Sequence, residues 1–257
     1  MRTKWFAAVL TALVVGSTGV SAQAATAAAG AGDWQFEVTP YVWAMGLDGN
    51  ISVNNKDANF DRSFSDLVDQ VDWAASVLGV AQYQKYVGFV QADYFTLKYN
   101  NDDFDQPLAQ ERLEEVTLDQ TFVTIAAGYQ FPGFVANSWI DVMLAARVNN
   151  MKLEVKNLAN RSEDETKTYW DPALVVRPTF ILTKDKKLRF NPTLSIGGGG
   201  DSELLYELQP QFQYDFTENI GARLGYRRLY YKIEGDRGDT QLKITYDGLI
   251  AGVSFLF

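Results

Sequence analysis

Hydrophobic and polar residues alternate over several long stretches of the chain. Between residues 206 and 216 every even position is apolar or aromatic, and every odd position is glutamate, glutamine or aspartate. A similar separation recurs at 34–42, 188–196 and 249–257. A period of two sends successive side chains to opposite faces of a β-strand, so each stretch predicts a strand between two unlike environments.

Extended along the chain, this pattern predicts about ten strands, a number typical of small membrane barrels. Eight or twelve strands are open alternatives, because the segment 73–84 alternates poorly. Many of the strands exceed the roughly five or six residues usual in globular proteins. The expected strands are residues 34–43, 71–85, 87–99, 116–131, 137–152, 168–183, 187–197, 203–216, 219–233 and 240–257.

The connections between these strands alternate between short and long. Turn residues predict tight turns at 85–86, 131–133, 184–187 and 217–219. The longer connections are 44–70, 100–115, 153–167, 198–202 and 234–239. Outer-membrane barrels have short periplasmic turns and longer external loops, and an even number of strands leaves both ends of the barrel chain in the periplasm.

Aromatic residues gather near the strand ends, where a membrane barrel has its interfacial girdles. Together with the strand lengths, this predicts an all-β fold, an antiparallel up-and-down transmembrane β-barrel. A soluble β-sandwich or barrel is the alternative, because its strands also alternate. The longest uncharged run after Asp33 is 121–140, and Pro132-Gly133 interrupts it, which excludes a membrane-spanning helix there.

The first part of the chain has the three regions of a secretory signal peptide. Arg2 and Lys4 precede an apolar run at 5–15, and Ala22-Gln23-Ala24 provides a small-residue cleavage site. Glycine and serine after position 15 argue against the alternative, a permanent helical anchor. The predicted organisation is a signal peptide at 1–24, a flexible leader at 25–32 and a transmembrane barrel domain at 33–257.

The composition removes several classes of function. The chain contains no cysteine and no histidine. Disulfide scaffolds, thiolate or histidine catalysis, and zinc or haem sites held by these residues are therefore excluded. A net charge of −9 argues against a nucleic-acid partner, which requires a basic surface. We expect no enzyme activity, no cofactor and no resident metal site.

Several short motifs add to the strand pattern and the signal peptide. They are Pro40-Tyr41-Val42-Trp43 with Gly46 and Gly49, Gly225-Tyr226-Arg227, and the terminal Gly252-Val253-Ser254-Phe255-Leu256-Phe257. On these residues the chain resembles the small outer-membrane β-barrel proteins of Gram-negative bacteria, in the broad OmpA-like or opacity-protein-like sense. The resemblance covers the whole chain after the leader in pattern, and its motifs are structural.

The resemblance implies a location more than an activity. It implies that the protein lies in the cell outer membrane, in contact with outer-membrane lipid and lipopolysaccharide. It also implies that the aromatic end of the last strand, Phe255 and Phe257, is the signal read by the outer-membrane assembly machinery. Many members of this class have no assigned function, so the resemblance implies no particular activity.

Projecting the alternation inward gives the residues expected to fill the barrel lumen. Six acids face five bases, which is nearly balanced, and every base is arginine, whose planar fork suits paired carboxylates in a confined space. The predicted lumen charge network is Glu37, Asp93, Asp141, Asp171, Glu207 and Asp215 with Arg147, Arg177, Arg189, Arg223 and Arg227.

Two functions fit such a lumen. In the first, mutually paired charges fill a narrow barrel whose role is structural or in surface interaction. In the second, some of the same residues line a narrow, porin-like channel for small polar solutes or ions. If Arg223 and Arg227 lack acidic partners, an anion path is favoured; if the charges are paired, a closed lumen is favoured.

The longer connections carry two further features. The segments 100–115 and 153–167 are acidic, which predicts solvated loop charges; the functional alternative is Ca²⁺ or Mg²⁺ binding, since these ions prefer carboxylate oxygens. In the first external loop, Phe64, Leu67, Val68 and Val71 recur at helical spacing after Ser63, a typical N-cap residue. We expect a short helix there, as a lid or plug over the barrel mouth or packed on its rim.

Overall fold

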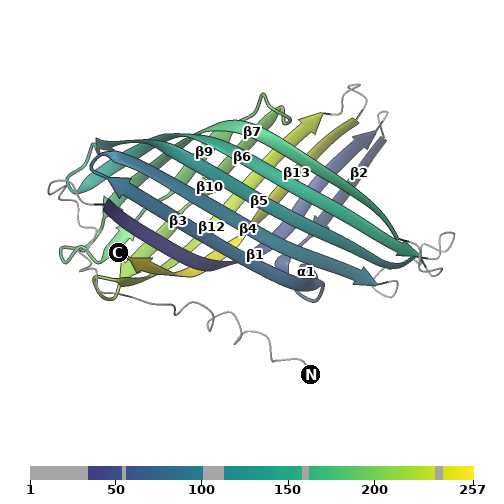
Figure 1. The fold of residues 1–257 in the computed structure, drawn as a ribbon, viewed down its shortest axis with the longest axis horizontal. Helices are drawn as coiled ribbons and strands as arrows, with labels where there is room; N and C mark the ends of the chain where they lie inside the picture. Colours follow the sequence, from purple (N-terminus) through teal and green to yellow (C-terminus); the bar gives the residue numbers. More distant parts are fainter. Residues whose placement is uncertain (1–33, 54–55, 101–112, 158–161, 235–239) are drawn as a thin grey trace.

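The computed structural model is a β-barrel made almost entirely of long antiparallel strands (Figure 1). No helix among the residues it covers is long and apolar enough to cross a membrane. The signal peptide and leader predicted at 1–24 and 25–32 lie outside the described residues. The structure describes residues 34–53, 56–100, 113–157, 162–234 and 240–257.

The strands follow one another around the barrel in chain order. Beginning at β1, each pairs with the next through β3, β4, β5, β6 and β7 to the β8–β11 region, and β12 and β13 lead back to β1. The strands are β1 (Trp34–Val53), β2 (Lys56–Arg62), β3 (Val71–Tyr83), β4 (Tyr86–Asn100), β5 (Leu113–Pro132), β6 (Ser138–Asn157), β7 (Ser162–Ile181), β8 (Leu188–Phe190), β9 (Thr193–Gly197), β10 (Leu204–Gln209), β11 (Gln211–Asp215), β12 (Ile220–Glu234) and β13 (Thr240–Leu256).

Two of the barrel's positions are each filled by an interrupted strand. β8 and β9 both pair with β7, and β10 and β11 both pair with β12. The interruptions fall at Pro192 and Pro210, because proline has no N–H to donate to the ladder. With β8–β9 and β10–β11 each counted once and β2 lying off the ring, the described chain closes with ten strands. The predicted barrel of about ten strands is confirmed.

Several strands are longer than the sequence pattern indicated. The prediction of one long loop at 44–70 is wrong, because β1 continues to Val53 and forms a hairpin with β2. The prediction of a loop at 153–167 is also wrong. β6 continues to Asn157 and β7 begins at Ser162, so the described residues of this segment lie in strands. Charged residues do not mark a loop here, because outward charges pair across strands, as Lys156 of β6 does with Glu115 of β5 at 3.0 Å.

The predicted short helix is present as α1 (Phe64–Leu67). Asp66 accepts hydrogen bonds from the backbone N and Oγ of Ser63 at 2.9 and 2.7 Å, which closes the first turn. The same two bonds hold the pKa of the Asp66 carboxyl below its usual range. α1 contacts β1 and β2, and Leu67 is buried in an apolar cluster. These contacts favour the alternative of packing on the rim over a lid across the mouth.

The barrel has two distinct ends. The turn end carries the connections at 84–85, 133–137, 182–187 and 216–219. There, backbone hydrogen bonds join Phe36 to Phe257, so both ends of the described chain lie at the turn end. The opposite, loop end is where β1, β4, β6, β9 and β12 finish.

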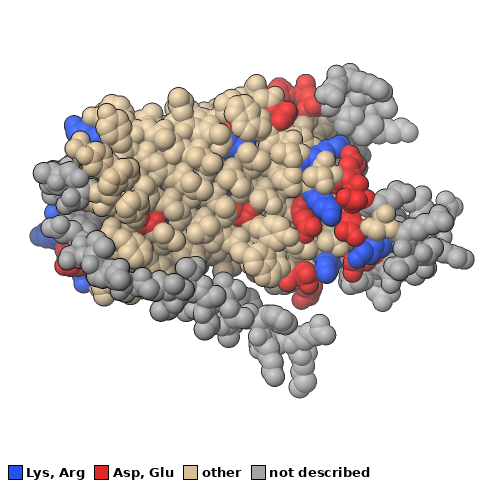
Figure 2. All heavy atoms as spheres, in the orientation of Figure 1, with Lys and Arg blue, Asp and Glu red and all other residues tan. Residues whose placement is uncertain are grey.

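Large apolar side chains lie on the outside of the barrel, and many polar and charged side chains lie inside it. Large apolar side chains such as Leu144 and Leu224 point outward and are 75% and 60% exposed, whereas Glu207 and Arg227 are buried inside. Figure 2 shows a broad band with few charged residues, while Lys, Arg, Asp and Glu gather toward the loop end. Exposing so much apolar surface to water is unfavourable. This exterior is the surface that a closed barrel presents to a bilayer.

Candidate functional site

The inner faces of the strands bring the eleven predicted charged residues into the lumen. Nine of them are buried, and Glu37 and Asp215 are partly exposed. They come from β1, β4, β6, β7, β8, β10, β11 and β12, because a period of two repeats the inward position along each strand. All five arginines form ion pairs with acids of this same set.

Four of these residues form a continuous chain of charges across the barrel. Arg227 on β12 donates from Nη1 to Asp93 Oδ2 on β4 and from Nε to Glu207 Oε1 on β10, each at 2.7 Å. The other oxygen of Glu207 accepts a hydrogen bond from Nη2 of Arg147 on β6. We call Asp93, Arg227, Glu207 and Arg147 the cross-lumen chain. It links strands on different sides of the barrel, so it lies across the lumen.

Neighbouring side chains hold the centre of this chain in place. Tyr41 donates its hydroxyl to Asp93 Oδ1 at 2.5 Å and accepts a hydrogen bond from Gln91 at 2.7 Å. The Arg227 guanidinium lies 4.4 Å from the centre of the Trp43 ring, a cation–π contact that also excludes water. Charges in such a site depend on their partners, because the bonds replace the water lost on burial.

A second set of ion pairs lies nearer the turn end. Arg177 donates from Nε and Nη2 to one oxygen of Asp141, at 3.2 and 3.0 Å. Arg189 pairs with Asp215 at 2.7 Å. Arg223 pairs with Glu37. Both Arg223 and Arg227 therefore have acidic partners, which is the condition that favours a closed lumen over an anion path.

Asp171 differs from the other acids because its described partners are not arginines. Its two carboxylate oxygens accept hydrogen bonds from the backbone N and Oγ of Ser202, at 2.8 and 2.7 Å. Ser202 is buried, and the amide of Asp201 beside it donates to the carbonyl of Trp170. Asp171 thus fastens the β9–β10 connection onto β7. Ser202 carries no signal in the sequence pattern, since only the folded connection brings it to Asp171.

We predict that Asp171→Ala loosens this connection locally. The substitution leaves two buried donors of Ser202 without a partner, which costs about 1–3 kcal/mol for such groups. Hydrogen–deuterium exchange of residues 198–203 should become faster, while exchange in β4 and β5 stays unchanged. Asp171→Asn, which retains one acceptor, should give an intermediate rate. Equal protection in all three proteins would contradict this role of Asp171.

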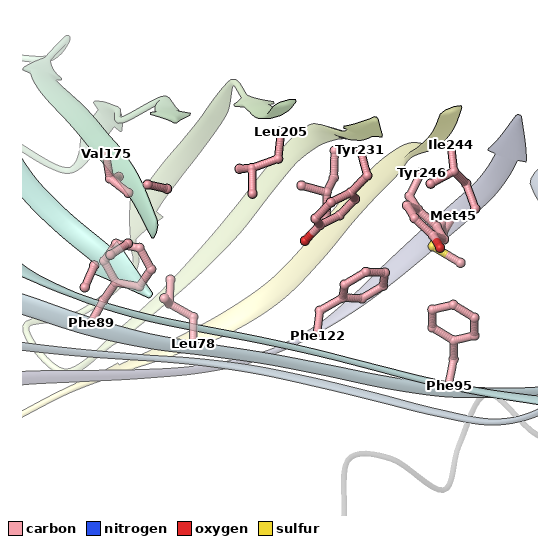
Figure 3. Packing of buried hydrophobic residues seen from close by; sticks show 14 of the residues in the cluster. Met45, Leu78, Phe89, Phe95, Phe122, Val175, Leu205, Tyr231, Ile244 and Tyr246 are labelled. Atoms are coloured by element: carbon pink, nitrogen blue, oxygen red, sulfur yellow. The ribbon is translucent and has the colours of Figure 1, made fainter. Parts of the chain in front are cut away.

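A cluster of aromatic residues lies in the lumen on the loop-end side of the cross-lumen chain. Phe122 on β5 lies 4.9 Å from Tyr246 on β13 and 6.3 Å from Tyr231 on β12, measured between ring centres. Trp43 and Phe95 lie 6.3 and 6.2 Å from the same ring. Figure 3 shows Phe122 pointing from one wall toward Tyr231 and Tyr246 on the facing wall. We call these five residues the aromatic plug.

One wall of the lumen keeps polar atoms without a protein partner. Among the described residues, buried atoms of this kind include Ser195 Oγ on β9 and Gln209 Oε1 on β10; away from this wall, they include Nε and Nη1 of Arg147 on β6. Every inward side chain of β8 and β9 is polar or glycine, whereas β4 contributes Phe89 and Phe95 to the facing wall. Buried polar groups of this kind are usually bonded to internal water, so we expect water along the β8–β10 wall.

The structure bears on the cation alternative only at some acidic residues. Asp102, Asp103, Asp105 and Glu111 lie outside the described residues. In the part that is described, Glu154 lies within ion-pair distance of Lys152 and Lys156, and Glu165 pairs with Lys167. No cluster of three or more potential acidic ligands occurs in that part of the chain. Glu154 and Glu165 therefore take part in ion pairs at the loop ends of β6 and β7.

Comparison with known proteins identifies the fold. No protein-family model matches the sequence, and no curated protein matches it. The solved structure of the outer membrane protease OmpT from Escherichia coli is similar, with a TM-score of 0.51 at 7% identity, over 87% of this chain and 97% of OmpT. At this identity the likeness shows the fold alone. The predicted resemblance to outer-membrane β-barrel proteins is confirmed at that level.

Two other solved structures are similar with lower TM-scores. Ail of Yersinia pestis matches with a TM-score of 0.32 at 12% identity, over 87% of this chain and 98% of Ail. The translocator domain of the autotransporter NalP from Neisseria meningitidis matches with a TM-score of 0.39 at 12% identity, over 88% of each chain.

Proposed function

We propose that this protein is a non-enzymatic outer-membrane β-barrel with a closed lumen and a structural or surface-interaction role. The observation that carries the proposal is the cross-lumen chain, in which Glu207 is shared by Arg147 and Arg227 and the latter also binds Asp93. The aromatic plug lies in series with it. A permeating ion would have to displace both.

In this proposal the turn end faces the periplasm and the charged loop end faces outward. The apolar band between them lies in the bilayer, with lipopolysaccharide at the outer leaflet as its lipid partner. Phe255 and Phe257 point outward on or just beyond β13 and are partly exposed, as a signal read from the membrane side by the assembly machinery requires. The loop end then presents the surface available to external partners.

The absence of histidine from the sequence supports a non-enzymatic role, because acid–base catalysis near neutral pH most often uses that residue. The carboxylates of the lumen are instead bonded to arginines or to Ser202. The protease activity of OmpT is not carried over, since the likeness to it concerns the fold.

Removing the central arginine tests the cross-lumen chain. Arg227→Ala leaves Asp93 and the shared Glu207 with one partner fewer in the interior, and breaking a buried pair costs about 3–5 kcal/mol. We expect a corresponding loss of unfolding free energy in urea, measured by tryptophan fluorescence in lipid vesicles. Arg228→Ala is the matched control: its side chain is half-exposed and lies 3.9 Å from Asp247, so its effect should stay within about 1 kcal/mol. Equal stability of the two variants would contradict the proposed chain.

The second candidate function is a narrow, porin-like channel. The specific observation that favours it is the polar β8–β10 wall, where Ser195 and Gln209 have unpartnered polar atoms. A file of water along this wall would offer a path for small polar solutes or ions around the ion pairs. Single-channel recording separates the two functions, because only the channel predicts discrete conductance steps in the wild-type protein.

A further inference from the structure

We propose that the β5–β6 turn, residues 133–137, is a lipid anchor that inserts Phe134 and Val135 into the phospholipid interface at the turn end. This inference rests on the proposed position of the barrel in a bilayer. Phe134 is 95% exposed and Val135 is 61% exposed. A phenylalanine so fully exposed at a turn buries almost no surface within the protein, so its apolar side chain is available to contact lipid.

Several backbone groups of the turn are hydrogen-bonded within the protein, which lowers the cost of entry into a lipid environment. The amide of Gly133 donates to the carbonyl of Ser138 at 3.0 Å. Ser138 Oγ donates to the carbonyl of Val135 at 2.6 Å, and the Asn137 carbonyl accepts from Ile181 at 3.1 Å. Asn137 adopts the left-handed backbone, with φ 57°, that reverses the chain. Polar groups bonded in this way are not left unpaired when water is withdrawn.

The turn is also continuous with an aromatic cluster on the outer surface. Tyr86 and Tyr129 pack edge to face with ring centres 5.6 Å apart, and Tyr129 lies 5.1 Å from Phe131, the residue that leads into the turn. Lys85 lies 6.0 Å from the Tyr129 ring, which places a cation beside the aromatic residues. Aromatic rings with an adjacent lysine are typical of the level of the lipid headgroups.

Charge separates this turn from the other three at the same end. No charged residue occurs from Thr121 to Ile140. The connections at 84–85, 182–187 and 216–219 carry lysine, aspartate or glutamate. Charged turns favour water, whereas an uncharged turn with two outward apolar side chains favours the interface. The expected depth is that of interfacial apolar side chains, about 5–10 Å into the boundary between headgroups and acyl chains.

Because the chain lacks cysteine, single cysteine variants can report the depth of each site. We would label Phe134→Cys, Leu144→Cys and Glu218→Cys with an environment-sensitive fluorophore in vesicles of phosphatidylethanolamine and phosphatidylglycerol. Leu144, 75% exposed on the apolar band, is the control for the bilayer position. Glu218 lies in a charged turn at the same end and is the aqueous control. Quenching is measured with nitroxides near the lipid glycerol, with nitroxides at the acyl-chain end, and with aqueous iodide.

We expect the probe at 134 to be quenched most by the shallow nitroxide, the probe at 144 by the deep one, and the probe at 218 by iodide. If 144 is quenched by lipid but 134 behaves as 218 does, the anchor is overturned while the bilayer position stands. That outcome would leave the turn in water, free to bind an apolar periplasmic protein. If 144 itself is quenched only by iodide, the bilayer position fails, and the anchor fails with it.

Discussion

Replacing Glu207 by glutamine is expected to destabilise the barrel by about 3–5 kcal/mol, because it removes the negative charge shared by two buried guanidinium groups. Arg147 has Glu207 as its described ion-pair partner, and Arg227 keeps only Asp93. Glutamine has nearly the same shape, so the change tests charge rather than packing. Unfolding in urea, monitored by tryptophan fluorescence in vesicles, gives the free energy.

Two further variants make this result specific. Glu154→Gln removes an exposed carboxylate whose ion pairs measure 3.8 Å, and its effect should stay within about 1 kcal/mol. Adding Arg147→Met to Glu207→Gln should recover part of the loss, since it removes a buried charge that has no counterion. Coupling between contacting residues is typically about 0.5–3 kcal/mol. A double variant as unstable as the sum of its parts would argue against the proposed pair.

Phe122→Ala is expected to cost about 3–5 kcal/mol, the usual loss when a buried phenylalanine is truncated. Phe122 is 2% exposed and is the ring that the other members of the aromatic plug contact. We expect the single variant to stay electrically silent, because the cross-lumen chain still occupies the lumen. Leu144→Ala, on the lipid-facing surface, is the control, and it should change stability far less.

Combining Phe122→Ala with Arg227→Ala removes one member of each barrier. We expect this double variant to conduct ions in a planar bilayer, whereas each single variant does not. Conduction by Phe122→Ala alone would show that the cross-lumen chain does not close the lumen. A silent but folded double variant, with its β-structure verified by circular dichroism, would show that other residues close it.

The sequence was sufficient for much of the fold because alternation is a local property. The period of two near 206–216 predicted the β10–β11 position, and it assigned Glu207 and Asp215 to one face. Alternation does not mark the strand boundaries where the outer face changes from apolar to charged, as at Lys156, because the strands continue there with charged outward residues. The helix at Phe64–Leu67 was predictable from its own spacing and its Ser63 cap.

The partners within the lumen were not predictable in the same way. Which arginine meets which acid depends on the tilt and stagger of the strands, a property of the closed barrel. The pairing of Arg227 with Asp93 joins residues 134 positions apart. Phe122 lies on an inner face that also carries Gln120 and Thr124, so the strand pattern marked it as one apolar residue among polar ones. Only its contact with facing strands identifies it as part of a plug.

The central claim is that the lumen of the wild-type barrel is closed, and ion conductance tests it most directly. The barrel chain after the leader would be refolded, inserted into a planar bilayer of known composition, and recorded at both polarities, with insertion verified independently by protease protection. We predict a silent bilayer for the wild-type protein and discrete steps for the variant that lacks both Phe122 and Arg227. Reproducible conductance steps from the wild-type protein would contradict the closed lumen and favour the narrow channel along the β8–β10 wall.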